Sequence, residues 1–170
     1  KELAGAVTII ARKEKVIYFS AQGMQDISAA KKMDKDSIFR IYSMTKAVVS
    51  VAAMRLVEQG KLKLDVPAST YIPSIAKMKF NGEIPNREMT LRDLLSHSSG
   101  LPNNVSTDRA LRAAGHPSLA ESNLEEIMGR IESVPLKYEP GEGWYYSFAA
   151  DVVGRLVEIG SGLRLDKALR

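Results

Sequence analysis

The chain of 170 residues contains no cysteine, which excludes disulfides and cysteine-ligated metal sites and leaves the compartment open. No segment approaches the roughly 18 uninterrupted apolar residues of a membrane-spanning helix. Aromatic residues make up 6% and the net charge of +4 comes from scattered lysines and arginines, so no nucleic-acid surface is expected. The two histidines, His97 and His116, lack a supporting group of carboxylates, which makes a poor metal site. We expect no metal, no other cofactor and no membrane contact.

Strand patterns are also few. Two β-branched and aromatic runs, residues 6–11 and 16–21, flank a polar tetrad and predict a β-hairpin. Residues 22–36 are polar and rich in lysine and predict a loop. An isolated two-stranded hairpin is only marginally stable in water. We therefore expect further strands, outside this sequence, to complete a sheet.

Residues 44–59 form the most apolar helical pattern, and Gly60 follows at a position typical of a helix end. Between Ala47 and Met54 every residue except Ser50 is apolar. A helix that is apolar on all sides is a buried helix. We therefore expect this helix to be covered on every side, which two strands alone cannot do.

The rest of the chain is predicted to be helical or irregular. A short helix begins at Thr90, which is predicted to cap it, and Asp93 stands where a variant of the capping box requires an acid. Residues 123–134 carry apolar side chains on one face and predict a single helix. Residues 147–162 predict another helix, which ends at a glycine within 160–162.

A serine stands three residues before a lysine at three places, Ser43/Lys46, Ser28/Lys31 and Ser74/Lys77. A serine hydroxyl becomes a good nucleophile when a base removes its proton, and a lysine is a base only when neutral. Half-neutrality at pH 7 requires the pKa of a lysine to fall by about 3.4, which costs about 4.6 kcal/mol and is within reach of full burial.

The context separates the three pairs. Only Ser43 and Lys46 open an apolar helix, at a spacing that places both side chains on one face. The free N–H groups of a helix N-terminus also stabilise an oxyanion. We expect this pair to be a nucleophile and its base, in a place where the lysine is desolvated. The alternative is that Ser43 only caps the helix and Lys46 extends to solvent.

Other arrangements of catalytic residues fit less well. No Gly-x-Ser-x-Gly motif is present, so an α/β-hydrolase nucleophile elbow is not supported. His97 and Asp93 could form a triad with a serine, which remains an alternative at this point. The glycines at 160–162 follow a helix rather than open one, so they indicate a helix end and not a phosphate-binding loop.

Three stretches of the sequence are FRIYSMTKAVVSVAAMRLVEQGKLKLDVPASTYIP (39–73), TLRDLLSHSSGLP (90–102) and YEPGEGWYYSFAADVVGRLVEIGSG (138–162). Together they resemble signature stretches of the serine β-lactamase and penicillin-binding-protein superfamily. They occur in the order of the family and at plausible distances. The chain is most similar to the class C β-lactamase-like branch and to the family VIII carboxylesterases.

The resemblance implies an α+β fold, with an antiparallel sheet flanked by helices and an all-helical subdomain. Residues 1–65 are expected to be the N-terminal part of the α/β domain, with the hairpin and the nucleophile helix, and residues 66–170 to form the helical subdomain. No Lys-Thr-Gly and no Ser-Asp-Asn motif is found. We therefore expect the chain to be the N-terminal part only, with the C-terminal strands absent from it.

The resemblance also implies the site. Ser43 is expected to be the acylated nucleophile, Lys46 its partner and Tyr146 the catalytic tyrosine, with lysine and tyrosine titrating as a pair. Tyr145 is expected to pack. Phe148 stands where class C β-lactamases carry an asparagine that holds the β-lactam amide, so we expect Phe148 to line the substrate site and to favour esters.

The expected function is a serine hydrolase that forms an acyl-enzyme, a carboxylesterase acting on short or medium acyl esters. Alternatives in the superfamily are a β-lactamase, a D-amino-acid peptidase and an acyltransferase. The resemblance implies that His97 packs and forms hydrogen bonds and is not the catalytic base. One oxyanion donor is expected to be the Ser43 N–H and the other to come from sequence outside this chain. An alternative of another class is a catalytically incomplete fragment or binding module that needs a second chain.

Overall fold

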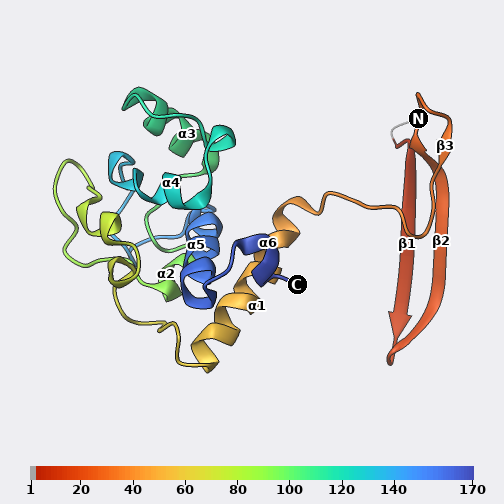
Figure 1. The fold of residues 1–170 in the computed structure, drawn as a ribbon, viewed down its shortest axis with the longest axis horizontal. Coiled ribbons are helices and arrows are strands. Elements are labelled where there is room, and N and C mark those ends of the chain that lie inside the picture. The colour runs from red at the N-terminus through yellow and green to blue at the C-terminus, as the bar shows by residue number, and fades with distance from the viewer. Residues whose placement is uncertain (1–2) are drawn as a thin grey trace. The chain divides into compact units, whose positions relative to one another are not determined.

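The computed structural model describes residues 3–170 and divides into two compact units, one up to Tyr42 and one from Ser43 to Arg170 (Figure 1). The strands are β1 (Gly5–Arg12), β2 (Lys15–Asp26) and β3 (Lys31–Lys32). The α-helices are α1 (Thr45–Glu58), α2 (Leu91–Leu95), α3 (Asn104–Ala113), α4 (Leu124–Met128), α5 (Ala149–Ser161) and α6 (Leu165–Ala168). Short 3-10 turns are η1 (Tyr42–Met44), η2 (Ala68–Thr70), η3 (Pro73–Lys77), η4 (Leu119–Glu121) and η5 (Ile131–Ser133).

The predicted hairpin is confirmed in the first unit, where β1 and β2 pair antiparallel. Its two loop residues, Lys13 and Glu14, have φ angles of 48° and 63°, as a type I′ turn requires. The loop predicted for residues 22–36 is wrong in part, because β2 continues to Asp26 and pairs with β3 to give a sheet of order β1-β2-β3. Backbone pairing there outweighs the weak strand propensity of a polar, glycine-containing segment.

Both faces of this sheet carry apolar side chains. Ile9 and Ile10 are neighbours in β1 and are 58% and 49% exposed. Consecutive residues of a strand point to opposite faces, so neither face is covered by other residues of the first unit. Strands that are apolar on both faces are typical of sheets covered on both sides.

The second unit is built around the pair α1 and α5, which pack against each other (Figure 1). Both helices are confirmed where the sequence predicts them, and each is followed by a glycine with φ of 71°, Gly60 and Gly162. All of the buried apolar residues in the described chain belong to this unit. Because α1 packs on α5, the two units divide after Tyr42. The predicted division between residues 65 and 66 stays a prediction.

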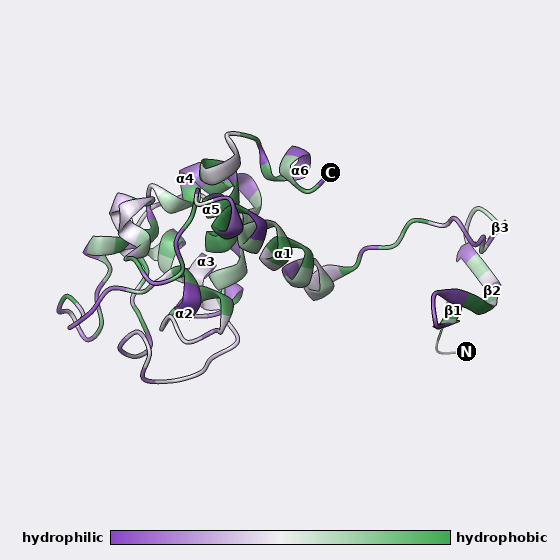
Figure 2. Cartoon of the chain, turned by 90° about the horizontal axis from the view of Figure 1, so that it is seen from below, coloured by the Kyte–Doolittle hydropathy of each residue, from purple (hydrophilic) through white to green (hydrophobic). Residues whose placement is uncertain are grey.

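Within the second unit, the helix α1 is covered on one side only. Val49, Ala53 and Leu56 are buried, whereas Val48 and Val51 on another side are 44% and 62% exposed. Figure 2 shows apolar residues along both α1 and α5. The all-round burial that the sequence leads us to expect for α1 is therefore not reached within the second unit.

The single helix predicted for residues 123–134 is wrong. The helix α4 ends at Met128, and Gly129 and Arg130 lead into the turn η5. The Arg130 side chain donates a hydrogen bond of 2.7 Å from Nε to the carbonyl of Glu126, the group that the Arg130 N–H would engage if the helix continued. The apolar residues on either side of the break still face the core.

Across residues 3–170, none of the helices combines the length and the hydropathy that crossing a membrane requires.

Candidate active site

Two of the three serine–lysine pairs have their hydroxyl engaged elsewhere. Ser28 Oγ donates a hydrogen bond of 2.8 Å to a carboxylate oxygen of Asp26. Ser74 Oγ donates to the carbonyl of Met128. These two serines therefore satisfy local turns and packing.

The third pair is part of a cluster with a tyrosine. Lys46 Nζ lies 3.2 Å from Ser43 Oγ, and Tyr146 OH lies 2.6 Å from the same oxygen. Lys46 Nζ also lies 4.7 Å from the centre of the Tyr146 ring. Ser43 is on η1, Lys46 on the first turn of α1, and Tyr146 on the segment that leads into α5. The packing of α1 on α5 thus brings together the three residues that the sequence predicts, and their catalytic roles stay a prediction.

The cluster favours loss of a proton from the phenol. Hydrogen bonds with Lys46 and with Ser43, together with the charge of Lys46, lower the pKa of Tyr146 below its ordinary value, against a smaller opposing effect of burial. Lys46 is half-buried, which falls short of the desolvation expected from the sequence. The lysine and the tyrosine therefore both lie within hydrogen-bonding distance of one serine hydroxyl, and their titration as a pair stays a prediction.

His97 lies behind Tyr146. The two rings are 4.9 Å apart between centroids, with an angle of 33° between their planes. The backbone N–H of Ser147 donates a hydrogen bond of 3.2 Å to His97 Nδ1. Burial lowers the pKa of His97, and the charge of Lys46 lowers it further. A ring nitrogen that accepts a hydrogen bond carries no proton, so the geometry and the lowered pKa both favour a neutral imidazole.

The alternative triad of a serine with His97 and Asp93 is not formed. The Asp93 carboxylate is buried and accepts hydrogen bonds from Arg87 Nη1 at 2.7 Å and Nη2 at 2.9 Å. It also accepts from the Thr90 N–H and hydroxyl, each at 2.9 Å, which confirms the predicted capping box of α2. Asp93 therefore fixes the start of the helix that carries His97 at its end.

Replacing Asp93 by alanine is expected to destabilise the fold by about 2 kcal/mol, because it removes the charged hydrogen bonds from Arg87 and the acid half of the capping box that Thr90 forms at the start of α2. Burial raises the pKa of Asp93, and the bonds from Arg87 and Thr90 lower it by more, so the net pKa is lowered. The difference between wild type and variant should therefore persist above the unfolded pKa near 3.9 and fade as the pH falls through the lowered folded-state pKa. Urea unfolding at several pH values measures this difference.

The matched control is Asp65→Ala. Asp65 also holds an arginine through two bonds, 2.6 and 2.9 Å from Arg92, but both side chains are more than half exposed. Exposed ion pairs contribute little to stability. If Asp93→Ala and Asp65→Ala lower the free energy of unfolding equally, burial of the Asp93 carboxylate does not make its pair with Arg87 more stabilising than the exposed pair.

Phe148 does not line the site. Its side chain is only 1% exposed, and its backbone N–H donates to the Pro102 carbonyl at the start of α5. The prediction that Phe148 contacts the substrate is therefore wrong. Its ring is part of the core, because the start of α5 is apolar and packs there. Tyr145, expected to pack, is half-buried, and its hydroxyl accepts a hydrogen bond of 3.0 Å from Asn103 Nδ2.

The sequence interpretation missed Asp151, an acid on the first turn of α5. Burial raises the pKa of this carboxyl, against the opposing effects of a hydrogen bond with Asn104 and of the charge of Lys46. The signal in the sequence was a single acid inside the apolar run Ala149–Val153. Such an acid on a core-facing helix is partly desolvated. Here the positive charge of Lys46 also acts on it and lowers its pKa.

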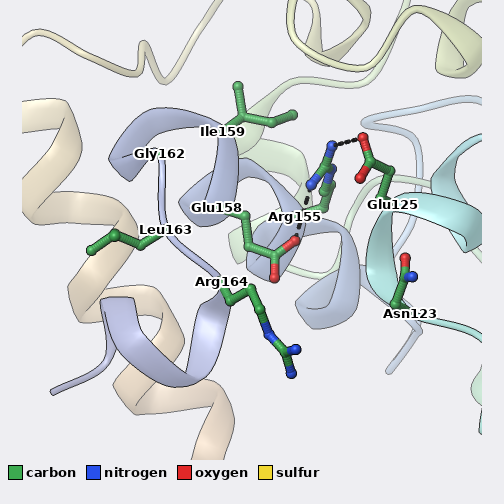
Figure 3. Close-up of a pocket in the computed structure, with 8 residues that line it drawn as sticks. All are labelled: Asn123, Glu125, Arg155, Glu158, Ile159, Gly162, Leu163 and Arg164. Atoms are coloured by element: carbon green, nitrogen blue, oxygen red, sulfur yellow. Dashed lines mark hydrogen bonds and ion pairs between the residues drawn. The ribbon is translucent and has the colours of Figure 1, made fainter.

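A separate cavity of about 540 Å³ lies elsewhere on the second unit. Figure 3 shows its central feature, Arg155 held between Glu125 and Glu158 at 2.8 and 3.1 Å. The two carboxylates offset the guanidinium charge, and none of the three clustered residues lines this cavity. Within the part of the chain that the structure describes, no group of three or more histidines or acids could hold a metal ion.

Comparison with known proteins places these features in a family. A family model described as Beta-lactamase matches residues 1–170. The esterase EstB of Burkholderia gladioli is 37% identical over 174 residues, covering 99% of this chain and 44% of EstB. The solved structure of EstCE1, described as a hydrolase with promiscuous acyltransferase activity, matches with a TM-score of 0.86 and 33% identity, over 98% of this chain and 44% of that one.

An octameric penicillin-binding protein homologue from Pyrococcus abyssi matches with a TM-score of 0.78 and 27% identity, over 99% of this chain and 37% of that one. The chain thus spans less than half the length of these relatives. The β-lactamase/transpeptidase-like fold and the superfamily resemblance expected from the three motifs are confirmed. Since the family model spans residues 1–170, the chain belongs to the Beta-lactamase family.

Proposed function

We propose that the protein containing this chain is a serine hydrolase that forms an acyl-enzyme with short or medium carboxylic esters. The observation that carries the proposal is the position of Ser43 Oγ, which lies within hydrogen-bonding distance of both Lys46 Nζ and Tyr146 OH. A serine becomes a strong nucleophile beside a base that is itself held by a third group. The lowered pKa of Tyr146 supports the phenol as that base.

In the acylation step, the Tyr146 phenolate accepts the proton of Ser43 as Oγ attacks the ester carbonyl carbon. Lys46 stabilises the phenolate through its positive charge. The carbonyl oxygen becomes an oxyanion, for which the Ser43 N–H is one donor. The tetrahedral intermediate then expels the alkoxide, which takes the proton back from the lysine–tyrosine pair and leaves as the alcohol.

In the deacylation step, water attacks the carbonyl carbon of the Ser43 ester. The same pair accepts a proton from the water and returns one to Ser43 Oγ as the carboxylic acid leaves. The two steps need no proton carrier besides the pair, because each proton that is taken is given back.

One observation favours esters: EstB, which is 37% identical, is named an esterase. The description of EstCE1 also favours acyl transfer as a second candidate, in which an alcohol replaces water in deacylation.

The test compares p-nitrophenyl butyrate with a chromogenic cephalosporin on the intact protein. We expect kcat/KM for the ester to exceed that for the cephalosporin, because the relative EstB is named an esterase. Equal or faster cephalosporin turnover would contradict an esterase. Added alcohol that appears as a new ester, identified by mass spectrometry, would support acyl transfer.

The alternative of another class is a catalytically incomplete chain. It is supported by the exposed apolar faces of the first unit and of α1 and by the share of the relatives that the chain spans. Under this alternative, the 170-residue chain is folded but inactive towards the ester, and a longer or second polypeptide restores turnover. Full activity of the isolated chain, shown to be alone by its mass, would exclude it.

A further inference from the structure

We infer that His97 is a positioning residue, which holds Tyr146 in place by binding the residues on either side of it; this rests on the proposed function of Tyr146. The carbonyl of His97 accepts a hydrogen bond of 2.9 Å from the N–H of Tyr145. Its Nδ1 accepts one of 3.2 Å from the N–H of Ser147. Its ring stacks against the Tyr146 ring between these two bonds. One residue therefore fixes the backbone before the phenol, the backbone after it and the ring itself.

His97 makes two further contacts with the segment that carries Tyr146. The Tyr138 hydroxyl donates a hydrogen bond of 3.1 Å to the same His97 carbonyl, and the Ser147 hydroxyl lies 3.3 Å from Nδ1. Ser147 is buried, and His97 Nδ1 is the acceptor of its backbone N–H. Loss of the imidazole would thus leave a buried donor unpaired, which costs more than a missing contact.

His97 has a left-handed backbone conformation, which is unusual for a residue with a side chain. His97 follows α2 and its cap Ser96, and it has φ of 58°. Glycine is the usual residue at this left-handed position after a helix, because a side chain there is strained. A strained residue persists where the surrounding structure holds it, and such residues gather at functional sites. Glycine at 97 should relieve the backbone, which separates the role of the side chain from that of the fold.

The hydrogen bond from the Ser147 N–H to His97 depends on the protonation state of the imidazole. Nδ1 accepts only while His97 is neutral. The titratable groups that face His97 are Lys46 on α1, and Tyr146 and Tyr138 on the segment before α5. The acid on its own helix, Asp93, is bonded to Arg87 and Thr90. As the pH falls through the lowered pKa of His97, the ring gains a proton and the bond from Ser147 is lost.

The experiment compares His97→Gly with His97→Asn in the intact protein. Asparagine tolerates the left-handed conformation, and its side-chain oxygen can replace Nδ1 as acceptor. We expect His97→Gly to lose about 100-fold in kcat, the effect of a misplaced catalytic group, with KM little changed. His97→Asn should recover much of kcat. In wild type, the acid limb of log kcat/KM should approach a slope of 2, and in His97→Asn a slope of 1.

Two further measurements complete the test. Exchange of the Ser147 amide proton, followed by NMR, should be slow in wild type and His97→Asn and fast in His97→Gly, whether or not the protein turns over an ester. This readout separates a failure of the positioning role from a failure of the proposed function. The control is His116→Asn, at the other histidine, which lies 3.2 Å from Ser133 Oγ and should leave kcat unchanged. Equal kcat in wild type and His97→Gly, or equal losses in the Gly and Asn variants, would overturn the inference.

Discussion

Replacing Ser43 by alanine is expected to lower kcat/KM for p-nitrophenyl butyrate by about 10³-fold or more, the scale seen when a nucleophile is removed. Without Oγ no covalent bond to the acyl group can form, and Lys46 and Tyr146 lose the oxygen on which they converge. The fold should be unaffected, since Ser43 is exposed. Intact mass after rapid mixing with the ester should show an acyl adduct on wild type and none on the variant.

The chain offers a matched control for this prediction. Ser28→Ala removes a serine with the same spacing to a lysine, also exposed, whose hydroxyl bonds only to the nearby Asp26 in the described structure. We expect it to retain full turnover and the same acyl adduct. Loss of activity in Ser28→Ala, or an acyl adduct that persists in Ser43→Ala, would show that the nucleophile has been assigned to the wrong serine.

Local features of the fold were predictable from the sequence. The helix α1 follows from an apolar run that ends at Gly60, and α2 from the cap at Thr90 with its partner Asp93. Each depends on residues within one or two helical turns of each other, where spacing determines contact. The break in the helix predicted for 123–134 also has a local cause, but it is a competing one, a glycine and an arginine that binds a carbonyl.

The site was predictable only in part, because its residues are far apart in the chain. Ser43 and Lys46 lie one turn apart, so the spacing identifies them together. Tyr146 lies 103 positions from Ser43, and a tyrosine two positions after a tryptophan has no local feature that indicates catalysis. The motif resemblance supplied it. The contacts of His97 depend on a left-handed backbone and on a partner 50 positions away, neither of which a spacing pattern contains.

Phe148 shows that a motif position can also predict the wrong environment for a side chain. Phe148 was expected at the substrate because of its place in a motif, yet it is buried at the start of α5. Motif position indicates where the backbone lies relative to the site, but the direction of the side chain depends on the helix that begins there. Here the helix turns the ring into the core.

Replacing Lys46 by alanine is expected to lower kcat/KM by about 100-fold and to move the acid limb of the pH profile to higher pH. The hydrogen bond and the charge of Lys46 lower the pKa of Tyr146. Without them this pKa should rise towards its ordinary value near 10. Turnover requires the phenolate, which is lost as the pH falls through that pKa, so the variant should need a more alkaline solution. Rates of p-nitrophenyl butyrate hydrolysis between pH 6 and pH 10 measure the shift.

Two variants make the result specific. Tyr146→Phe removes the phenol, so it should lose a similar factor and no longer show this limb at any pH. Lys77→Ala removes an exposed lysine, which pairs with Glu132 at 3.2 Å, and should leave the profile unchanged. If Lys46→Ala hydrolyses the ester at the wild-type rate with the same acid limb, Lys46 neither lowers the pKa of the phenol nor shares the proton of Ser43. If only the rate falls and the limb stays in place, the lysine orients Ser43 without acting through Tyr146.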